Sequence, residues 1–394
     1  MIQKNKIDEI DLEDLQKLID NEIPEGRTIE YKEKINVGND EEKREFLADI
    51  SSFANTDGGD IIFGITENRN TGFPEKIVGL DITNADEEIR RINSIIQNGL
   101  QPRITPPQSH SIKLSTGKYV IIIRIKKSWN SPHRIIFKGW DKFCSRNSKG
   151  KYQLDVIELR NAFNLSESRF DKISTFINRR IHSIHYGDSP LQTIETPKVI
   201  LHVIPINAFD PQTLIDFTQY PEIIKDIATL TDYKLIGTFN SDGKVKIGKV
   251  GEKNPYEYVQ LFRNGIIESV GSNYLIGIED SCIPLTPFEE KIIDASKNYL
   301  LALKGLNIEG PIIIFLTLVG VQKFTRCTDK NRYPMLERDI PQIQKEILTL
   351  PEVMIEEYNE NIENILKKTF DALANACGLE KSQNYDENGN RKKQ

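Results

Sequence analysis

Residues 51–65 read Ser51-Ser52-Phe53-Ala54-Asn55-Thr56-Asp57-Gly58-Gly59-Asp60-Ile61-Ile62-Phe63-Gly64-Ile65, and this stretch decides the fold of the first part of the chain. The segment from Glu41 to Ala54 carries apolar side chains at helical spacing, so we expect a helix there. The segment from Ile61 to Thr66 is an apolar run with the length of a buried strand. The Asp57-Gly58-Gly59 string between them has the composition of a tight turn, because glycine tolerates positive φ angles. The stretch therefore predicts a helix, a turn and a strand in immediate succession.

Helices and strands are predicted on both sides of this stretch. Helical spacing indicates further helices over residues 11–21 and 85–96 and from about Asp155, and alternation indicates strands over 28–35, 109–114 and 119–127. We expect an α+β domain over residues 10–165, a connecting helix and linker over 166–196, and a C-terminal α/β-type domain of unknown role over 197–378. That second domain contains hairpin turns at Ser241-Asp242-Gly243 and, with a type I′ signature, at Asn264-Gly265. The polar residues 379–394 are predicted to form a disordered tail.

Composition and the cysteines limit the class of protein. The chain has 394 residues and a formal net charge of −6, which argues against a protein that coats nucleic acid over its whole surface. The four cysteines, Cys144, Cys282, Cys327 and Cys377, are far apart, so neither a disulfide framework nor a zinc motif is written locally. The first residues lack the apolar region of a signal peptide, and no apolar run reaches membrane-spanning length. We expect a cytoplasmic protein that does not enter a membrane.

Three glutamates are candidate metal ligands. Glu25 precedes the first predicted strand, Glu30 lies in it, and Glu67 ends the strand after the Asp-Gly-Gly turn. If these strands are neighbours, their carboxylates converge, and Mg²⁺ or Mn²⁺ prefers such oxygen ligands. Lys32 shares a strand face with Glu30 and is a candidate phosphate ligand. The alternative is a solvated strand edge on which the glutamates pair with neighbouring lysine and arginine side chains.

The segment from Arg124 to Lys151 concentrates positive charge. It holds nine lysine and arginine residues against one acid, Asp141, and it is interleaved with aromatic residues. Such a segment is typical of a surface that follows phosphates and stacks on unpaired bases. The alternative is that the aromatic side chains are core and the lysines form a solubilising face. The candidate nucleic-acid ligands are Lys126, Lys127, His133, Arg134, Lys138 and Arg146.

These strings together resemble the Schlafen AlbA-like domain over residues 12–165. Glu25 and Glu30 have the spacing of the family's first two acids, Glu30-Tyr31-Lys32 matches its Glu-aromatic-Lys triplet, and Glu67 follows Gly64 by three residues. The Pro132-His133 pair and the Phe143-Cys144-Ser145-Arg146 string match the end of the family's pattern. The third acid is glutamate here, where nucleolytic members have aspartate. The resemblance implies a domain with a mixed sheet and helices, and pairing of such domains into a homodimer.

The leading hypothesis is a metal-dependent endoribonuclease that acts on structured RNA such as tRNA. Glu25, Glu30 and Glu67 would hold Mg²⁺ or Mn²⁺, and Lys32 would belong to the catalytic site. On this hypothesis Glu30→Gln abolishes cleavage and spares the fold. One alternative is a non-catalytic regulator that binds DNA or RNA through the basic segment. Another is an assembly or sensor protein that recruits a partner through its C-terminal domain.

Overall fold

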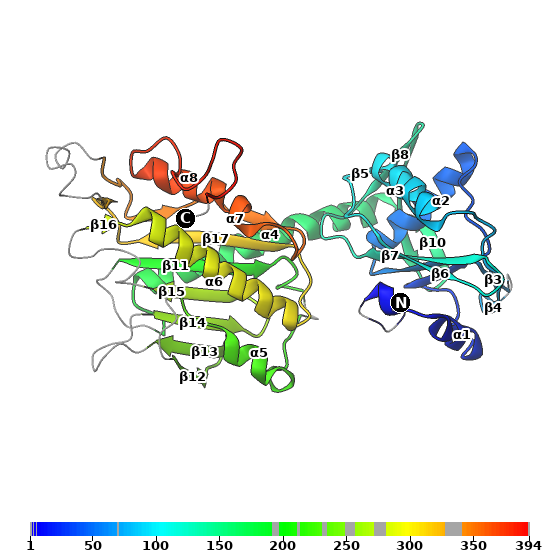
Figure 1. Cartoon of the computed structure of the whole chain (residues 1–394), viewed down its shortest axis with the longest axis horizontal. Helices are drawn as coiled ribbons and strands as arrows, with labels where there is room; N and C mark the ends of the chain where they lie inside the picture. The colour runs from blue at the N-terminus through cyan, green and yellow to red at the C-terminus, as the bar shows by residue number, and fades with distance from the viewer. Residues whose placement is uncertain are drawn as a thin grey trace. The chain divides into compact units, whose positions relative to one another are not determined.

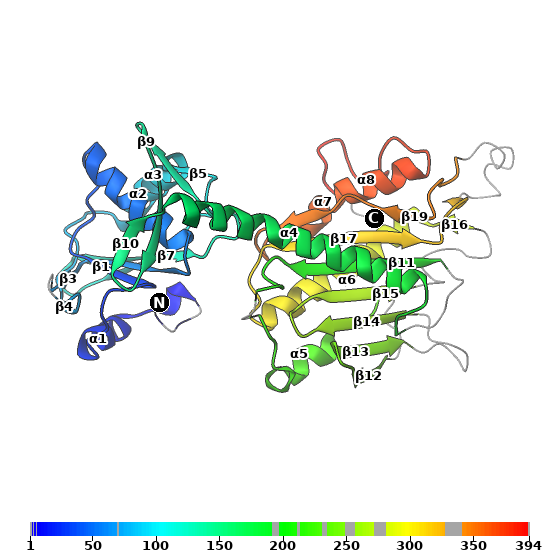
Figure 2. The same cartoon turned by 180° about the vertical axis from the view of Figure 1, so that it is seen from behind.

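Figures 1 and 2 show the computed structural model of the chain from opposite sides. The structure describes residues 2, 4, 6–68, 71–190, 197–210, 213–230, 235–248, 257–271, 281–327 and 341–392. The chain divides into two compact units, residues 1–168 and 169–394. The division falls inside one long helix, α4 (Val156–His185), which contains the predicted connecting helix. Residues 191–196 of the predicted linker lie outside the described residues.

The first unit mixes helices with two sheets, as an α+β domain does. Its helical segments are η1 (Ile7–Glu9), α1 (Leu12–Asp20), α2 (Asp40–Ala54), α3 (Ala85–Gly99) and the start of α4. One sheet has the order β1-β2-β7-β6, with strands Ile29–Lys32, Gly58–Phe63, Tyr119–Lys126 and Gln108–Lys113. The other has the order β10-β9-β8-β5, with strands Gly150–Gln153, Trp140–Asn147, Arg134–Phe137 and Leu100–Gln101. A separate hairpin joins β3 (Ile65–Glu67) to β4 (Pro74–Ile77).

The first sheet is mixed and is buried on both faces. β1 runs parallel to β2, while the β2–β7 and β7–β6 pairs are antiparallel. Ile61 and Ile123 pack toward α2 and α3, whereas Ile62 and Ile122 pack toward Leu15 of α1. Figures 1 and 2 show these helices on opposite sides of the sheet. Burial on both faces explains why β7 carries a continuous apolar run from Val120 to Ile123 instead of alternating.

Side chains cap the N-termini of two helices in the first unit. Asp11 caps α1 through a capping box with Asp14, and Asn39 caps α2 through a capping box with Glu42. In each box the cap side chain accepts a hydrogen bond from the third helical N–H group, which otherwise has no partner inside the helix. The predicted helix and strand form, but the turn lies at residues 55–57, and Gly58 and Gly59 already belong to β2, which ends at Phe63.

The polar residues that end α2 fasten the second sheet to this helix. Asn55 accepts a hydrogen bond from the His133 N–H (2.7 Å) and donates to the carbonyl oxygens of His133 (3.1 Å) and Cys144 (2.8 Å). The Thr56 hydroxyl donates to the Ser52 carbonyl oxygen (2.7 Å), as expected for a residue that ends a helix. The same hydroxyl accepts a hydrogen bond from the Arg146 N–H (3.1 Å). The Asn-Thr pair therefore bridges α2 to β8 and β9.

The second unit is built on one antiparallel sheet. Its order is β12-β13-β14-β15-β11-β17-β19, with β20 also paired to β17. These strands are Leu235–Phe239, Gly243–Gly248, Glu257–Phe262, Ile267–Gly271, Lys198–Pro205, Ile312–Val319, Ile347–Thr349 and Val353–Ile355. All these pairs are antiparallel, so the α/β-type arrangement expected for this unit is replaced by an α+β one. The remaining elements are η2 (Phe217–Gln219), α5 (Pro221–Asp226), β16 (Cys282–Ile283), α6 (Leu285–Gly305), β18 (Thr325–Arg326), α7 (Ile362–Ile365) and α8 (Lys367–Ala376).

Helices cover both faces of this sheet. The side chains of Val199, Leu201 and Val203 pack with α6, and Figure 2 shows α4 crossing the opposite face. On that face Arg180 of α4 donates two hydrogen bonds, of 2.8 and 2.7 Å, to the buried carboxylate of Glu268. Burial alone would raise the pKa of Glu268, but Arg180 and His202 outweigh it and lower the pKa to about 2.

Two local expectations for the second unit are corrected. Both predicted hairpins form, but at Asn264-Gly265 only Gly265 has a positive φ (83°), so the turn is not type I′. Residues 379–392 are ordered where a disordered tail was expected, because the buried carboxylate of Glu289 accepts hydrogen bonds from Ser382 (2.6 Å), Asn384 (2.8 Å) and Arg391 (2.9 Å). Cys282 and Cys327 form a disulfide, a pairing that their separation of 45 residues in sequence did not indicate.

The tight turn allows a direct test of the fold. Gly58 has a φ of 73°, and a Cβ atom there would lie 2.6 Å from the Ile125 carbonyl oxygen. Gly117 has a φ of 84° but open space around it, so it is a matched control for backbone strain alone. We expect Gly58→Ala to lower the free energy of unfolding by about 1–3 kcal/mol more than Gly117→Ala.

Urea unfolding of the full chain, followed by tryptophan fluorescence, measures this difference. Both tryptophans, Trp129 and Trp140, belong to the first unit, so the signal reports on that unit. Equal unfolding midpoints for the two variants would show that the turn is not closely packed against β7.

Candidate active site

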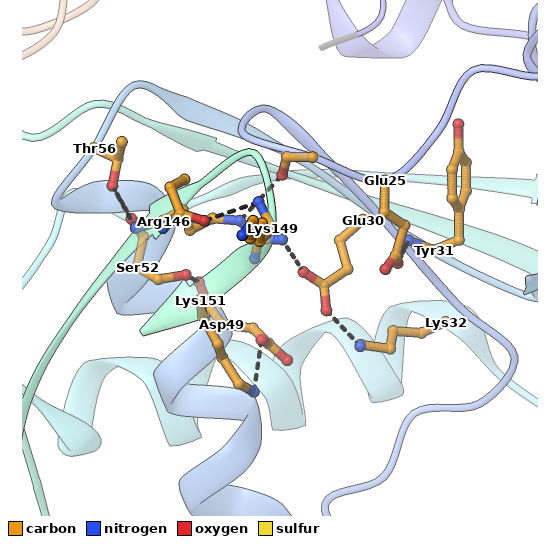
Figure 3. Close-up of polar contacts among 12 residues, drawn as sticks. Glu25, Glu30, Tyr31, Lys32, Asp49, Ser52, Thr56, Arg146, Lys149 and Lys151 are labelled. Carbon is orange, nitrogen blue, oxygen red and sulfur yellow. Dashed lines mark hydrogen bonds and ion pairs between the residues drawn. The ribbon is translucent and has the colours of Figure 1, made fainter. Parts of the chain in front are cut away.

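β1 presents its apolar and charged side chains to opposite faces of the sheet. Ile29 and Tyr31 pack in the core together with Leu15. Because successive strand residues alternate in direction, Glu30 and Lys32 face the other side. Figure 3 shows the Glu30 carboxylate between the side chains of Lys32 and Arg146.

Glu30 is buried and paired with both cations. Its carboxylate forms ion pairs with Lys32 Nζ and Arg146 Nη2, and only 6% of the residue is exposed. Burial would raise the pKa of Glu30, but Lys32 and Arg146 outweigh it and hold the pKa below its usual range. The Arg146 guanidinium also lies 4.0 Å from the centre of the Phe53 ring. Glu30 is therefore a permanently charged group with its partners already in place.

A second pair of charges, absent from the sequence prediction, extends this cluster. Asp49 of α2 is 5% exposed, and its Oδ1 atom lies 2.8 Å from Lys151 Nζ of β10. Lys151 also donates a hydrogen bond of 2.5 Å to Glu45. Burial raises the pKa of Asp49, and nearby Glu30 raises it further. The sequence did indicate that Asp49 is buried, because it lies three residues from Phe46 and four from Phe53 and so shares the buried face of the helix.

Glu25 and Glu67 form a separate carboxyl pair. The Glu25 carboxylate accepts a hydrogen bond from the Tyr31 N–H (2.7 Å), and the Glu25 N–H donates to the Gly72 carbonyl oxygen (2.8 Å), which fixes the loop before β1 beside the β3–β4 hairpin. Burial, a hydrogen bond with Glu67 and the charge of Glu30 raise the pKa of Glu25 to about 8. The Glu67 Oε2 atom is buried and has no hydrogen-bond partner. Glu25 therefore keeps its proton at neutral pH.

The three predicted metal ligands therefore do not form one equivalent set. Glu25 and Glu67 meet, whereas Glu30 lies close enough to raise the pKa of Glu25 but is neutralised by its own cations. Across the part of the chain that the structure describes, no group of three or more His, Cys, Asp or Glu side chains is arranged to hold a metal ion. The described geometry offers a two-carboxylate site at Glu25 and Glu67.

The basic segment divides into buried and exposed members. His133 is fully buried, with Nδ1 2.7 Å from the Pro102 carbonyl oxygen, and burial lowers its pKa. The Arg146 side chain is 2% exposed. These two predicted nucleic-acid ligands are thus interior groups: the Arg146 guanidinium lies against Phe53 of α2, and the His133 ring lies against the Pro102 carbonyl. The predicted ligands that remain at the surface are Lys126, Lys127, Arg134 and Lys138.

Three exposed cations of this segment, Lys127, Arg134 and Lys138, lie beside acidic side chains at the surface. Lys127 lies 3.9 Å from Asp57, and Arg134 lies 3.7 Å from Asp141. Lys138 donates a hydrogen bond of 2.6 Å to Asp40. Exposed pairs of this kind contribute little to stability, so these side chains can exchange their partners for phosphate groups. Of the predicted aromatic platforms, Phe137 and Trp140 pack against the core and are only partly exposed.

The raised pKa of Glu25 predicts how the free energy of unfolding depends on pH. The pKa of Glu25 is about 8 in the folded protein against an ordinary 4.5, so over this range the folded protein keeps a proton that the unfolded chain releases. Stability is therefore fully present below about pH 4.5 and is lost as the pH rises through about 8. In EDTA, Glu25→Gln should lose less stability than wild type between about pH 5 and about pH 8.5.

Urea midpoints from tryptophan fluorescence measure the dependence at each pH. Glu33→Gln is the control, since Glu33 is exposed and only 3.7 Å from Lys34. If the urea midpoints of wild type and Glu25→Gln changed in parallel with pH, the pKa of Glu25 would not be raised in the folded protein.

Glu30→Gln should destabilise the fold, contrary to the expectation from sequence. The substitution leaves the buried Arg146 guanidinium without its carboxylate, and breaking a buried pair from one side costs about 3–5 kcal/mol. Glu33→Gln, three residues further along the chain, should change the free energy of unfolding by less than about 1 kcal/mol. Equal urea midpoints for the two variants would contradict a structural role for the Glu30–Arg146 pair.

Comparisons with known proteins agree with this fold. Residues 25–155 match the family Schlafen, AlbA_2, which suggests a function related to nucleic acids. The DIP2311 protein from Corynebacterium diphtheriae shares 18% identity at a TM-score of 0.24, over 33% of this chain and 22% of that one. The N-terminal domain of a RecG-related protein from Nitrosomonas europaea shares 20% identity at a TM-score of 0.27, over 36% of this chain and 92% of that one. No curated protein matches. Neither solved structure is similar enough to inform function.

Proposed function

We propose that the Schlafen AlbA_2 domain formed by residues 25–155 binds RNA and cleaves it with a divalent cation, as an endoribonuclease acting on structured RNA such as tRNA. The observation that carries this proposal is the Glu25–Glu67 carboxyl pair. The pKa of Glu25 is raised to about 8 by burial and by the neighbouring Glu67 and Glu30 carboxylates, and Glu67 Oε2 is buried without a hydrogen bond. Such a pair is costly for folding unless a cation replaces the proton.

The chemistry of the pair fits Mg²⁺ or Mn²⁺. Both ions prefer carboxylate oxygens and share their coordination with water and substrate phosphates. A bound ion would supply an activated water molecule and neutralise charge that develops on the phosphate. Glu25 and Glu67 would hold it, with Glu30 nearby adding negative charge.

Lys32 and Glu30 have different roles in this proposal. The Lys32 side chain is 35% exposed, so its ammonium group reaches solvent and can bind a phosphate oxygen beside the carboxyl pair. Glu30 raises the pKa of Lys32 and keeps it charged. Glu30 also holds Arg146 in the interior, so it acts as a positioning residue.

The exposed cations supply the binding surface. Lys126, Lys127, Arg134 and Lys138 lie on one segment of a protein whose net charge is negative. Contacts from such side chains to the phosphate backbone bring affinity that depends strongly on salt and little on sequence. They would position the RNA for cleavage at the carboxyl pair.

One observation favours a second candidate, a non-catalytic DNA- or RNA-binding regulator. Glu30 is neutralised by Lys32 and Arg146, which leaves two carboxylates where the sequence predicted three ligands. In this case the exposed cations carry the function and the carboxyl pair is incidental. The homodimer, and a partner bound by the C-terminal domain, stay predictions.

Within the described residues, none of the helices has both the length and the apolar character needed to cross a bilayer. Cytoplasmic localisation stays a prediction.

Cleavage assays with matched variants separate the two candidates. Labelled tRNA and single-stranded DNA are incubated with the full chain in Mn²⁺, in Mg²⁺ and in EDTA. We expect RNA cleavage that requires the metal and falls by about 10²-fold or more in Glu25→Gln and Glu67→Gln, because each substitution removes a group that stabilises charge at the phosphate. Glu33→Gln, an exposed glutamate outside the pair, should cleave like wild type.

Thermal unfolding gives a second readout that does not depend on turnover. Mn²⁺ should raise the midpoint of wild type and Glu33→Gln at about pH 8, and should leave Glu25→Gln and Glu67→Gln unchanged, because a ligand stabilises only the form that binds it. Salt-sensitive RNA or DNA binding in EDTA, together with no cleavage in either metal, would reject the nuclease and leave the regulator.

A further inference from the structure

The sheet of the second unit ends in a strand whose outer side has no partner strand among the described residues. β12 pairs with β13 on one side only, and Figures 1 and 2 show β12 at the end of the sheet, beyond β13. The opposite end is formed by β19 and β20, each three residues long. Short edge strands offer little to a pairing partner, whereas β12 has five consecutive residues. β12 is therefore the edge at which the sheet can be extended.

The hydrogen bonds at the β12–β13 turn show which backbone groups of β12 point outward. Asn240 and Gly243 exchange two hydrogen bonds, of 3.0 and 3.3 Å, and so form a hydrogen-bonded pair. In an antiparallel ladder such positions alternate with positions whose N–H and C=O groups point away from the neighbouring strand. Thr238 therefore bonds to β13, while the backbone groups of Gly237 and Phe239 face solvent. An extended polypeptide can bond to these groups by adding a strand.

The sequence of β12 leaves this edge open. Natural edge strands are usually protected by charged residues or proline, and Leu235–Phe239 contains neither. Ile236 and Phe239 are each 57% exposed, so their apolar side chains are available to a partner. Gly237 lies between them, and a glycine inside a strand often marks a place where another backbone approaches closely.

The side chains on one face of this edge indicate the charge of the partner. The Lys244 ammonium lies 4.2 Å from the centre of the Phe239 ring. The Arg263 guanidinium lies 5.7 Å from the centre of the Phe217 ring. These two rings are 5.9 Å apart, so both cations lie beside one aromatic pair. Within the part of the chain that the structure describes, neither cation forms an ion pair with a carboxylate. A partner that carries carboxylates would complement them.

The other face of β12 is apolar. Ile236 lies on it, opposite Ile247 of β13, because successive strand residues alternate in direction. A partner strand in which acidic and apolar residues alternate would place its carboxylates on the Lys244 side and its apolar side chains on the Ile236 side. The two faces together therefore indicate the sequence pattern of the partner.

A second copy of this chain fits the edge less well. Antiparallel pairing of β12 with itself would bring Lys244 of both copies to the same face of the extended sheet. β12 contains no acidic residue to pair with them, and like charges that meet at an interface oppose association. The charges therefore favour a different, acidic polypeptide.

We infer that β12 binds an extended acidic segment of another protein, which pairs with the backbone of Gly237 and Phe239 and places carboxylates against Lys244 and Arg263. The inference goes beyond the proposed function, because it concerns the second unit and depends on neither metal nor RNA. Addition of a strand to an exposed edge is a recurrent mode of peptide recognition, in which backbone bonds give affinity and alternate side chains give specificity.

Fluorescence anisotropy with the full chain and labelled peptides tests the inference. The probe is a peptide of about ten residues, long enough for one strand, in which glutamate and valine alternate. The comparison is a peptide of the same length in which lysine replaces every glutamate. We expect the glutamate peptide to bind at least about tenfold more tightly than the lysine peptide, because the latter meets Lys244 and Arg263 with like charge.

Two variants test the backbone pairing and the charge separately. Gly237→Pro removes an outward N–H group and leaves the ladder with β13 intact, since proline is tolerated at such edge positions. Lys244→Glu reverses the charge beside Phe239. Each should weaken binding of the glutamate peptide by at least about tenfold. Lys291→Glu, the same change at an exposed position on α6, should bind like wild type.

Every other outcome counts against the inference. Equal binding of the two peptides, or no binding of the glutamate peptide, would overturn it. Binding that Gly237→Pro and Lys244→Glu both retain would place the peptide elsewhere on the protein. If Gly237→Pro fails to fold, Lys244→Glu and the lysine peptide still decide. A dimer seen by sedimentation of the full chain and lost in folded Gly237→Pro would show that a second copy occupies β12 instead. None of these results depends on RNA cleavage, so the proposed function stands or falls separately.

Discussion

The buried ion pair between Glu30 and Arg146 joins three elements of the first unit that are distant in sequence. Glu30 comes from β1 and Arg146 from β9, and the guanidinium lies against Phe53 at the end of α2. Charges in the interior are tolerated only when they are paired and hydrogen-bonded, so the pair fixes where these elements meet. The hydrogen bonds of Asn55 and Thr56 to β8 and β9 hold the same junction from the backbone side.

This pair also determines which acids can take part in chemistry. Lys32 and Arg146 neutralise Glu30, so the charge of Glu30 stabilises the fold. Asp49 is similarly placed beside Lys151. Glu25 and Glu67 differ, since neither is paired with a cation and the pKa of Glu25 is raised to about 8. A pKa near neutrality, together with an unpaired buried oxygen, is the usual mark of a site prepared for a cation or for proton transfer.

The second unit shows the opposite arrangement. Glu268 is buried, but Arg180, His202 and Tyr258 all bond to its carboxylate, and its pKa of about 2 means that it stays ionised. Glu289 is likewise satisfied by donors from residues 382–391. Glu268 of β15 fastens α4 to the sheet, and Glu289 of α6 fastens the C-terminal segment to that helix. Glu268 and Glu289 are fully hydrogen-bonded, whereas Glu67 has a buried oxygen without a partner. This difference is the physical reason for proposing that the chemistry belongs to the first unit.

The sequence by itself predicted the helices and the first sheet of the first unit and grouped Glu25, Glu30 and Glu67, because hydrophobic period and turn glycines act locally. It determined less well which charged residues are exposed. His133 and Arg146 were expected at the surface and are buried, and Asp49 was missed. Tertiary structure alone decided these points, since burial and ion pairing depend on which strand lies beside which helix. For the same reason, only the fold separated Glu30 from the acids that its spacing had grouped with it.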